Sequence, residues 1–153
     1  MKRPLLIIVA LFLTLSAFSQ NYKKAIGFRA GSSVGVSYKE FLSDIDAAEA
    51  IFDIDFTNRR HTKVKGSVYY LRHFDVNVDG LSLYAGPGTS AGVIIEGIYQ
   101  NNFVMSLDIM GGVEYKFNNV PVVLSCDWTP KYQFITLAGF SPGNFGLTVR
   151  YTF

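Results

Sequence analysis

The chain has 153 residues, of which 49% are hydrophobic, 15% aromatic and 17% charged, with a formal net charge of +2. This length suits one domain, and so small a net charge argues against a nucleic-acid partner. Soluble domains usually carry about 25% charged residues. Yet past the N-terminus no run approaches the ~20 apolar residues of a spanning helix, so the apolar residues are dispersed.

The first twenty residues, MKRPLLIIVALFLTLSAFSQ, have the pattern of a signal peptide. A basic start is followed by an apolar core and by two small residues, Ala17 and Ser19, at the spacing that signal peptidase requires. We expect cleavage before Gln20, which gives a signal peptide at 1–19 and a mature domain at 20–153. The competing interpretation is a membrane anchor, but the apolar run is short for a span. The only cysteine, Cys126, does not follow the cleavage site and leaves no partner for an internal disulfide.

The mature chain alternates apolar and polar residues with period two, which predicts strands. Only 44–50 carries a weak helical pattern. Seven breaks rich in Gly, Asn, Asp, Ser and Pro separate the runs. We therefore expect eight strands, at 24–31, 33–42, 47–57, 62–74, 81–95, 103–117, 122–135 and 145–153. The break at 31–33 could instead be a bulge, which would leave seven strands.

Two turns make testable statements about register. A turn at 58–60 would put Asp55 opposite Lys63 and Asp53 opposite Lys65, a favourable pairing of charges on one face. A four-residue turn at 118–121 would align the apolar phases of the strands that it joins. The predicted fold class is all-β: an antiparallel up-and-down barrel of eight strands.

Alternation is compatible with two opposite proteins. A soluble barrel is apolar inside, whereas an outer-membrane barrel is apolar outside and polar inside. The polar phase is rich in Gly, Ser and Tyr and carries balanced charge, as a narrow polar lumen would need. We therefore favour a transmembrane barrel with a lumen charge network at Arg29, Asp53, Asp55, Lys63, Lys65, Asp108, Glu114, Asp127 and Arg150. Further charged residues share this phase: Lys39, Glu49, Lys116 and Lys131.

Aromatic residues of the apolar phase gather near the strand ends, as in the interfacial girdles of membrane barrels. Arg72 is the exception in this phase, and near a rim it could reach the headgroups. An even number of strands would also bring both termini to the same side of the membrane. The predicted girdle comprises Tyr38, Tyr70, Phe74, Tyr115, Phe117, Trp128, Tyr151 and Phe153.

The chain ends FGLTVRYTF, in which Val149, Tyr151 and Phe153 alternate up to the final residue. This ending resembles the assembly signal of Gram-negative outer-membrane barrels, and residues 24–153 resemble the small eight-stranded OmpA/OmpX type. The resemblance implies recognition by the barrel-assembly machinery and insertion into outer-membrane lipid. We expect a monomer. The resemblance itself implies no activity, since the fold hosts structural proteins, enzymes and adhesins alike.

A search for chemistry yields little. His61 and His73 have no serine within two positions, so the His-x-Ser pattern of lipid A deacylases is missing. The run from Asp75 to Gly80 matches the start of a calcium loop, but its twelfth position would be Gly86 instead of Glu, which favours a polar turn.

We expect no catalytic residue, metal or cofactor, and a structural or interactive role in the envelope. The lumen charges could alternatively form a proton or ion path, although eight strands enclose a lumen that side chains fill. Two other functions stay open: a lipid-modifying enzyme, and a secreted soluble barrel that binds an apolar ligand.

Overall fold

Strands make up almost all of the regular structure. The computed structural model describes residues 22–55, 62–96, 102–135 and 138–153, so the expected signal peptide, its cleavage site and His61 lie outside the described residues. Within these ranges no helix occurs that could cross a membrane. The strands are β1 (Lys24–Gly31), β2 (Ser33–Phe41), β3 (Asp46–Asp55), β4 (Thr62–Asp75), β5 (Leu81–Glu96), β6 (Phe103–Lys116), β7 (Val122–Trp128), β8 (Lys131–Ile135), β9 (Gly139–Ser141) and β10 (Phe145–Thr152).

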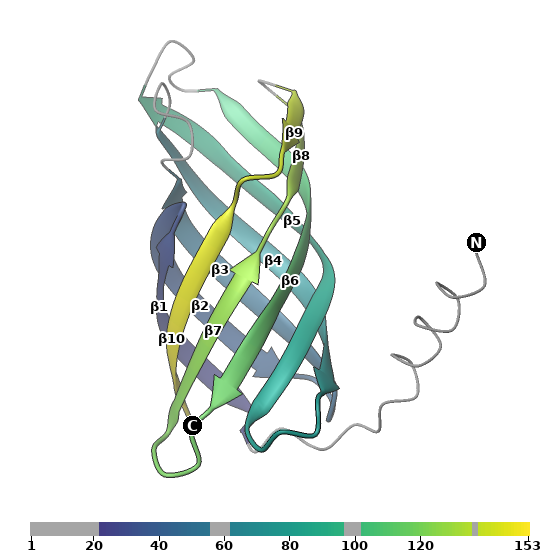
Figure 1. Ribbon diagram of the computed structural model, residues 1–153. Helices are drawn as coiled ribbons and strands as arrows, with labels where there is room; N and C mark the ends of the chain where they lie inside the picture. Colours follow the sequence, from purple (N-terminus) through teal and green to yellow (C-terminus); the bar gives the residue numbers. More distant parts are fainter. Residues whose placement is uncertain (1–21, 56–61, 97–101, 136–137) are drawn as a thin grey trace, which may run out of the picture.

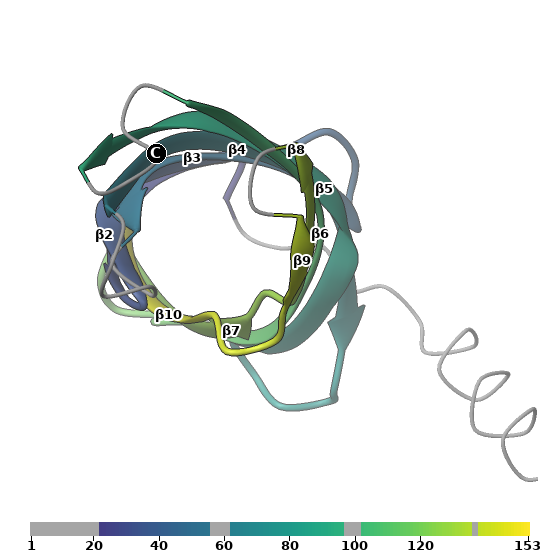
Figure 2. The same ribbon diagram turned by 90° about the horizontal axis from the view of Figure 1, so that it is seen from above.

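The strands close into an antiparallel barrel (Figures 1 and 2). Each strand from β1 to β7 pairs with the next, β7 pairs with β10, and β10 pairs back onto β1. The predicted barrel of eight strands is therefore confirmed, with β8 and β9 extending the wall at one end. The break at 31–33 is a hairpin turn and not a bulge, because β1 and β2 are separate antiparallel strands with Arg29 opposite Gly35.

The two ends of the barrel differ. We call the end where β1 begins and β10 ends the terminal end, and the opposite end, with the β1–β2 turn and the β8–β9 hairpin, the far end (Figure 1). Because eight strands run up and down in turn, the first and last of them start and finish at the terminal end. Lys24 and Phe153 lock this seam by exchanging backbone hydrogen bonds of 3.3 and 2.9 Å.

One predicted strand, 122–135, is two strands. Pro130 has no N–H to donate to a ladder, so the regular pairing stops at Thr129 and resumes at Lys131. The Thr129 N–H bonds instead to the carbonyl of Asn144, and the Pro130 carbonyl accepts from Ile109. The break expected between the strands at 122–135 and 145–153 was wrong in part, since β9 lies within it and pairs with β8.

The other local predictions from the sequence concern the segment 44–50 and the registers of two hairpins. The weak helical pattern at 44–50 does not form a helix, because β3 begins at Asp46 and its ladder with β2 prevails. Both register statements are confirmed. Asp53 lies opposite Lys65 and Asp55 opposite Lys63. Likewise the apolar phases of β6 and β7 coincide.

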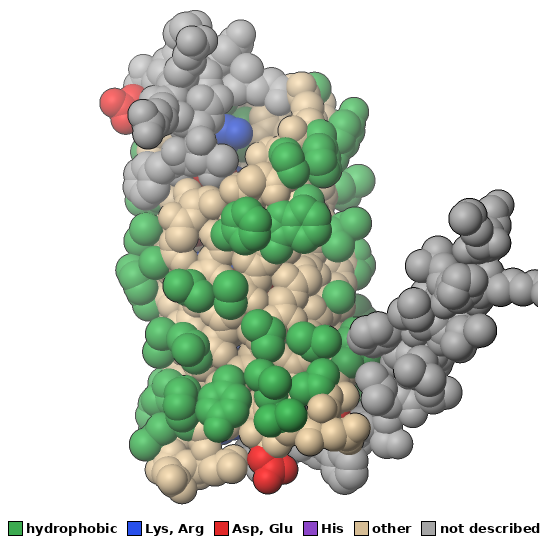
Figure 3. Space-filling model, in the orientation of Figure 1, with side chains coloured by type: hydrophobic (Ala, Val, Ile, Leu, Met, Phe, Trp, Pro, Cys, Tyr) green, Lys and Arg blue, Asp and Glu red, His purple; other side chains and the backbone are tan. Residues whose placement is uncertain are grey.

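The wall separates polar from apolar side chains in the inverse sense to a soluble barrel. Large apolar side chains cover the outside, as the green surface of Figure 3 shows. Ile109 is 63% exposed, Leu107 61% and Phe28 57%. Among the described residues that are buried, polar and charged side chains outnumber apolar ones. The interior is thus held together by hydrogen bonds and ion pairs more than by an apolar core.

Candidate functional site

The terminal half of the interior is built around one arginine. Arg150 on β10 is fully buried and its guanidinium reaches both Glu49 on β3 and Glu114 on β6, the second at 3.6 Å. It also donates to the hydroxyls of Ser37, at 3.0 Å, and Ser125, at 2.7 Å. A buried charge is stable only when it is paired and hydrogen-bonded. This one side chain therefore ties together strands from around the whole barrel.

Lys39 and Tyr22 complete this half. The Lys39 ammonium lies 2.7 Å from Glu114 Oε2 and 4.4 Å from the centre of the Tyr84 ring, a cation–π contact. Tyr22, just before β1, donates its hydroxyl to Glu114 Oε1 at 2.6 Å and packs edge-on against Phe41 at 5.1 Å. The segment that leads into β1 thus turns a buried aromatic side chain into the terminal end of the barrel and caps the charges there.

His73 lies inside this group. Its ring packs 4.7 Å from Phe41 and stacks 5.3 Å from Tyr84. Its Nδ1 is 3.4 Å from the hydroxyl of Ser82, while its Nε2 has no hydrogen-bond partner among the described residues. A histidine–serine pair does therefore exist, nine residues apart across the β4–β5 hairpin, but both groups are buried among filled positions.

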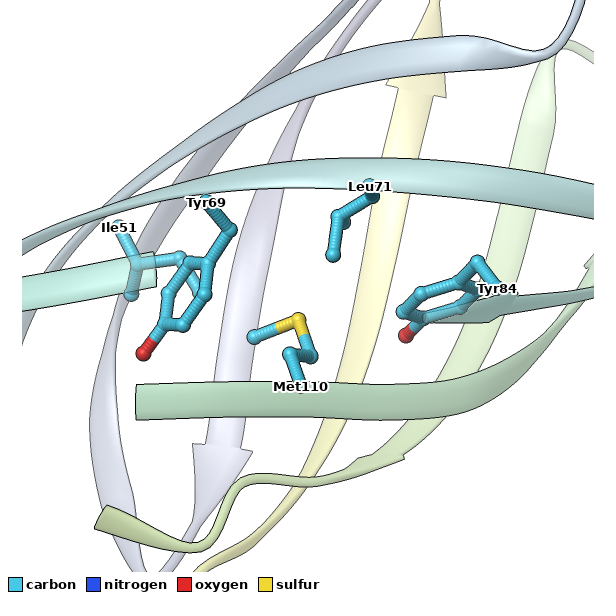
Figure 4. Packing of buried hydrophobic residues seen from close by; sticks show 5 residues of the cluster. All are labelled: Ile51, Tyr69, Leu71, Tyr84 and Met110. Carbon is cyan, nitrogen blue, oxygen red and sulfur yellow. The ribbon is translucent and has the colours of Figure 1, made fainter. Parts of the chain in front are cut away.

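The middle of the barrel holds a second arginine clamp. Arg29 binds Asp127 with both terminal nitrogens, at 2.5 and 2.6 Å. Gly146 makes this possible, since a Cβ there would fall on the Arg29 guanidinium. Beside the clamp, five buried side chains form a small apolar cluster in which, in the view of Figure 4, Met110 lies between two tyrosine rings. The members of the cluster are Ile51, Tyr69, Leu71, Tyr84 and Met110.

The far half is organised differently. Asp108 accepts hydrogen bonds from three hydroxyls, those of Tyr69 at 3.0 Å, Ser106 at 2.7 Å and Ser90. Lys131 is its only described cationic partner and stands off at 3.6 Å. Lys65 pairs with Asp55 at 2.5 Å. Here each of these two lysines forms one described ion pair, whereas Arg150 forms two.

A pocket of about 210 Å³ opens in this far half. Three lysines, Lys63, Lys65 and Lys131, share its lining with one carboxylate, Asp55. Lys63 Nζ donates to Gln133 Oε1 at 3.0 Å and is only partly buried. Phe140 and Asn144 supply part of the opposite wall. The far end therefore holds a pocket, whereas the charged side chains around Arg150 at the terminal end are fully buried.

The structure brings the predicted charge network together. All of its members are buried except Lys63. Lys39, Glu49 and Lys131, which share the polar phase, join it in the ion pairs already described. Lys116 does not, because its ammonium bonds to the rim carbonyls of Phe117 and Val120.

Three tyrosines also take part in the interior hydrogen-bond network, although the sequence did not identify them as members. Tyr22, Tyr69 and Tyr84 each bring a hydroxyl to a buried carboxylate, those of Glu114, Asp108 and Asp127 respectively. Their polar-phase position was visible for Tyr69 and Tyr84. Tyr22 precedes the first strand, so no alternation could have indicated that it turns inward.

The predicted girdle residues lie on the outer surface. Seven of them are exposed and Phe74 is half-buried. Trp128 donates its indole N–H to the Pro142 carbonyl at 2.5 Å, near the far end. Arg72, the charged exception on this face, is paired with Asp46, its Nε at 2.8 Å from the carboxylate. In the predicted assembly signal, Val149, Tyr151 and Phe153 all point outward.

Two further candidates are a metal site and the calcium-loop-like run from Asp75 to Gly80. In the described ranges no group of three His, Cys, Asp or Glu could hold a metal ion. The run from Asp75 is a polar turn, as expected. The Asn77 N–H bonds to the Asp75 carboxylate at 2.9 Å, and Asn77 adopts a left-handed φ of 58°. Comparison of the sequence with protein-family models and with curated proteins gives no match.

Proposed function

We propose that this protein spans the outer membrane as a closed barrel with a structural or interactive role in the cell envelope. The observation that carries the proposal is the inversion of polarity across the wall. Contiguous apolar patches beyond a few hundred Å² are rare on soluble monomers and mark protein or membrane contacts. Here apolar side chains are exposed on every barrel strand, from Ile26 on β1 to Tyr151 on β10.

Energetics favour lipid over water outside this wall. Burying one large apolar side chain is worth about 1.5–3 kcal/mol, and the exposed ones surround the barrel. Outer-membrane barrels have an apolar band about 25 Å tall that faces lipid. The strands of this chain, at 7 to 16 residues in the eight-stranded part, are of the right order for such a band.

The two alternatives receive less support. A soluble carrier of an apolar ligand needs an apolar lumen, whereas this interior is crossed by Arg29–Asp127 and Arg150–Glu49 ion pairs. A lipid-modifying enzyme needs a nucleophile and base that a lipid can reach, and His73 with Ser82 is enclosed. An open pore is also disfavoured, because buried side chains fill the terminal half. We propose a monomer whose partners are outer-membrane lipid and, during biogenesis, the barrel-assembly machinery.

Cell fractionation tests the location. The full chain, expressed in a Gram-negative host, should appear in the outer-membrane fraction and migrate differently on gels before and after heating. Recovery of the mature protein in the soluble periplasm would refute the proposal. Lipid profiles of cells with and without the protein should be the same, and altered acylation of lipid A would favour the enzyme instead.

The final residue allows a sharper test of assembly. The Phe153 side chain is 62% exposed and only its backbone is bonded to β1, so Phe153→Ala should leave the stability of the folded barrel nearly unchanged. If Phe153 is an assembly signal, the same substitution should lower the amount of folded protein in the membrane several-fold. Phe145→Ala is the matched control, as it removes an equally exposed ring at the start of the same strand.

A further inference from the structure

The pocket at the far end has the chemistry of an anion site. Its lining includes three ammonium groups, from Lys63, Lys65 and Lys131, and a single carboxylate, Asp55. Two further carboxylates, Asp53 and Asp108, lie near it but are not part of its lining. The surface that a ligand would touch is therefore positive.

The nearby carboxylates are already engaged. Asp108 takes hydrogen bonds from three hydroxyls and forms an ion pair with Lys131. Asp53 accepts from the Ser33 hydroxyl. Asp55 is bound by Lys65. Asp55 also attracts the Lys63 ammonium, and the Lys131 ammonium lies 3.6 Å from the Asp108 carboxylate.

The lysines themselves are crowded. Lys65 and Lys131 are near enough to each other for their like charges to interact unfavourably, and Lys63 is near Lys65. Like charges that share a poorly solvated site raise the free energy of the folded state. An anion between them would relieve this repulsion. Each ammonium has three N–H donors, and Lys63 has one described acceptor, Gln133, so donors remain for a ligand.

We propose that this pocket, lined by Lys63, Lys65 and Lys131, binds a phosphate group. The lining has two more positive than negative charges, which suits a dianion better than a carboxylate. Lysine ammonium groups also bind phosphate readily as point charges. Polar side chains of Ser106, Gln133 and Asn144 line the same space. The volume of about 210 Å³ leaves room for the first atoms that a phosphate monoester carries.

The wall around the pocket suggests two sources of that phosphate. In the described residues β9 pairs only with β8, so its other edge is not closed by a ladder. A basic side chain is visible from outside in the upper part of the barrel in Figure 3. Free phosphate from solution is one source, and a lipid headgroup that enters beside β9, where Phe140 is 65% exposed, is the other.

Binding is measured on the intact folded barrel in a non-ionic, phosphate-free detergent. Isothermal titration with inorganic phosphate forms one arm, and titration with a short-chain phosphatidic acid forms the other. We expect saturable binding in at least one arm. A tighter fit for phosphatidic acid would identify a lipid headgroup, and equal affinities would identify the phosphate alone. Absence of saturable binding in both arms would overturn the proposal.

The variants separate the pocket from general charge. Lys63→Gln and Lys131→Gln should each weaken binding at least tenfold. Lys116→Gln removes the same charge at the opposite end of the barrel, where it bonds rim carbonyls, and should leave binding unchanged. Heat-modifiable gel migration verifies that each variant is folded. Equal loss in Lys116→Gln, or unchanged binding in both pocket variants, would refute the assignment. The result is independent of cellular location, so failure here leaves the proposed function untouched.

Discussion

The two halves of the barrel interior are built from the same alternating pattern, yet they differ in how their charges are connected. In the terminal half one guanidinium, that of Arg150, joins two glutamates and two serines, and Lys39 and Tyr22 share one of those glutamates. In the far half Lys65 and Lys131 each form one described ion pair, and three lysines line a pocket. The shared network therefore coincides with fully buried side chains, and the simpler ion pairs coincide with a pocket.

This contrast predicts that the two halves contribute differently to stability and to ligand binding. A shared, fully buried network is strongly coupled, so removing one member leaves several others unpaired. Lys63, at the edge of the pocket, is only partly buried, so it keeps contact with water and loses little when its partner goes. We therefore expect the terminal half to determine the free energy of unfolding and the far half to determine the proposed phosphate binding.

The largest effect should come from the centre of the terminal network. Arg150→Met keeps most of the side-chain volume but leaves Glu49 and Glu114 with an uncompensated charge. Breaking a buried ion pair from one side costs about 3–5 kcal/mol, so the free energy of unfolding should fall by that order. Urea unfolding of the barrel in detergent, followed by gel migration, measures it. Arg150→Met combined with Glu49→Gln should recover part of the loss, and a loss below about 1 kcal/mol in the single variant would contradict the shared network.

The next effect tests the clamp between the two halves. Gly146→Ala places a methyl group on the Arg29 guanidinium and should displace it from Asp127. Overpacking of this kind costs about 1–3 kcal/mol. The matched control is Gly66→Ala, since a Cβ at Gly66 meets nothing within 4 Å. Equal stability of the two variants in the same urea experiment would show that Arg29 is not confined by the glycine.

A smaller effect is expected at the cap of the terminal half. Tyr22→Phe keeps the packing against Phe41 and removes only the hydroxyl that bonds to Glu114. A hydrogen bond to a charged group contributes about 1.5–3 kcal/mol, and Lys39 and Arg150 still compensate this carboxylate, so we expect the low end of that range. Tyr38→Phe is the control, because its hydroxyl bonds to exposed Glu40. If both variants have the same free energy of unfolding, the Tyr22 hydroxyl adds nothing to stability and only the Tyr22 ring contributes.

The smallest effect on stability should be in the far half. Lys63→Gln removes a partly exposed ammonium whose described partner is the neutral Gln133, so the free energy of unfolding should change by less than about 1 kcal/mol. The same variant should nevertheless lose phosphate binding. A large loss of stability here would remove the distinction between the halves, and the urea experiment used for Arg150→Met decides it.

Much of the architecture could be predicted from period-two alternation. Strand number, the hairpin registers and the inward direction of Arg29, Asp53 and Arg150 all follow from which phase a residue occupies. The break at Pro130 could have been predicted too, since proline cannot donate to a ladder, but the alternation on either side hid it.

The connections inside the barrel could not be predicted. The position of a residue in the alternating pattern shows that its charge faces inward. It does not show which distant strand that charge contacts. The Asp55–Lys65 ion pair shows this, because both cross-strand pairings were foreseen and the ion pair formed diagonally instead. Arg150 with Glu49 and Tyr22 with Glu114 depend on barrel closure and strand tilt, which no single hairpin determines.

The seam between β1 and β10 has a consequence for the order of events in folding. Ile26 pairs with Tyr151, so the contact that closes the ring joins residues almost the whole domain apart. Contacts of such long sequence separation form late and slowly. Until β10 arrives, the edge of β1 presents unpaired backbone groups that invite association with other chains. Pairing of β10 with β1 therefore removes this exposed edge. Any factor that speeds the pairing protects the protein from aggregation.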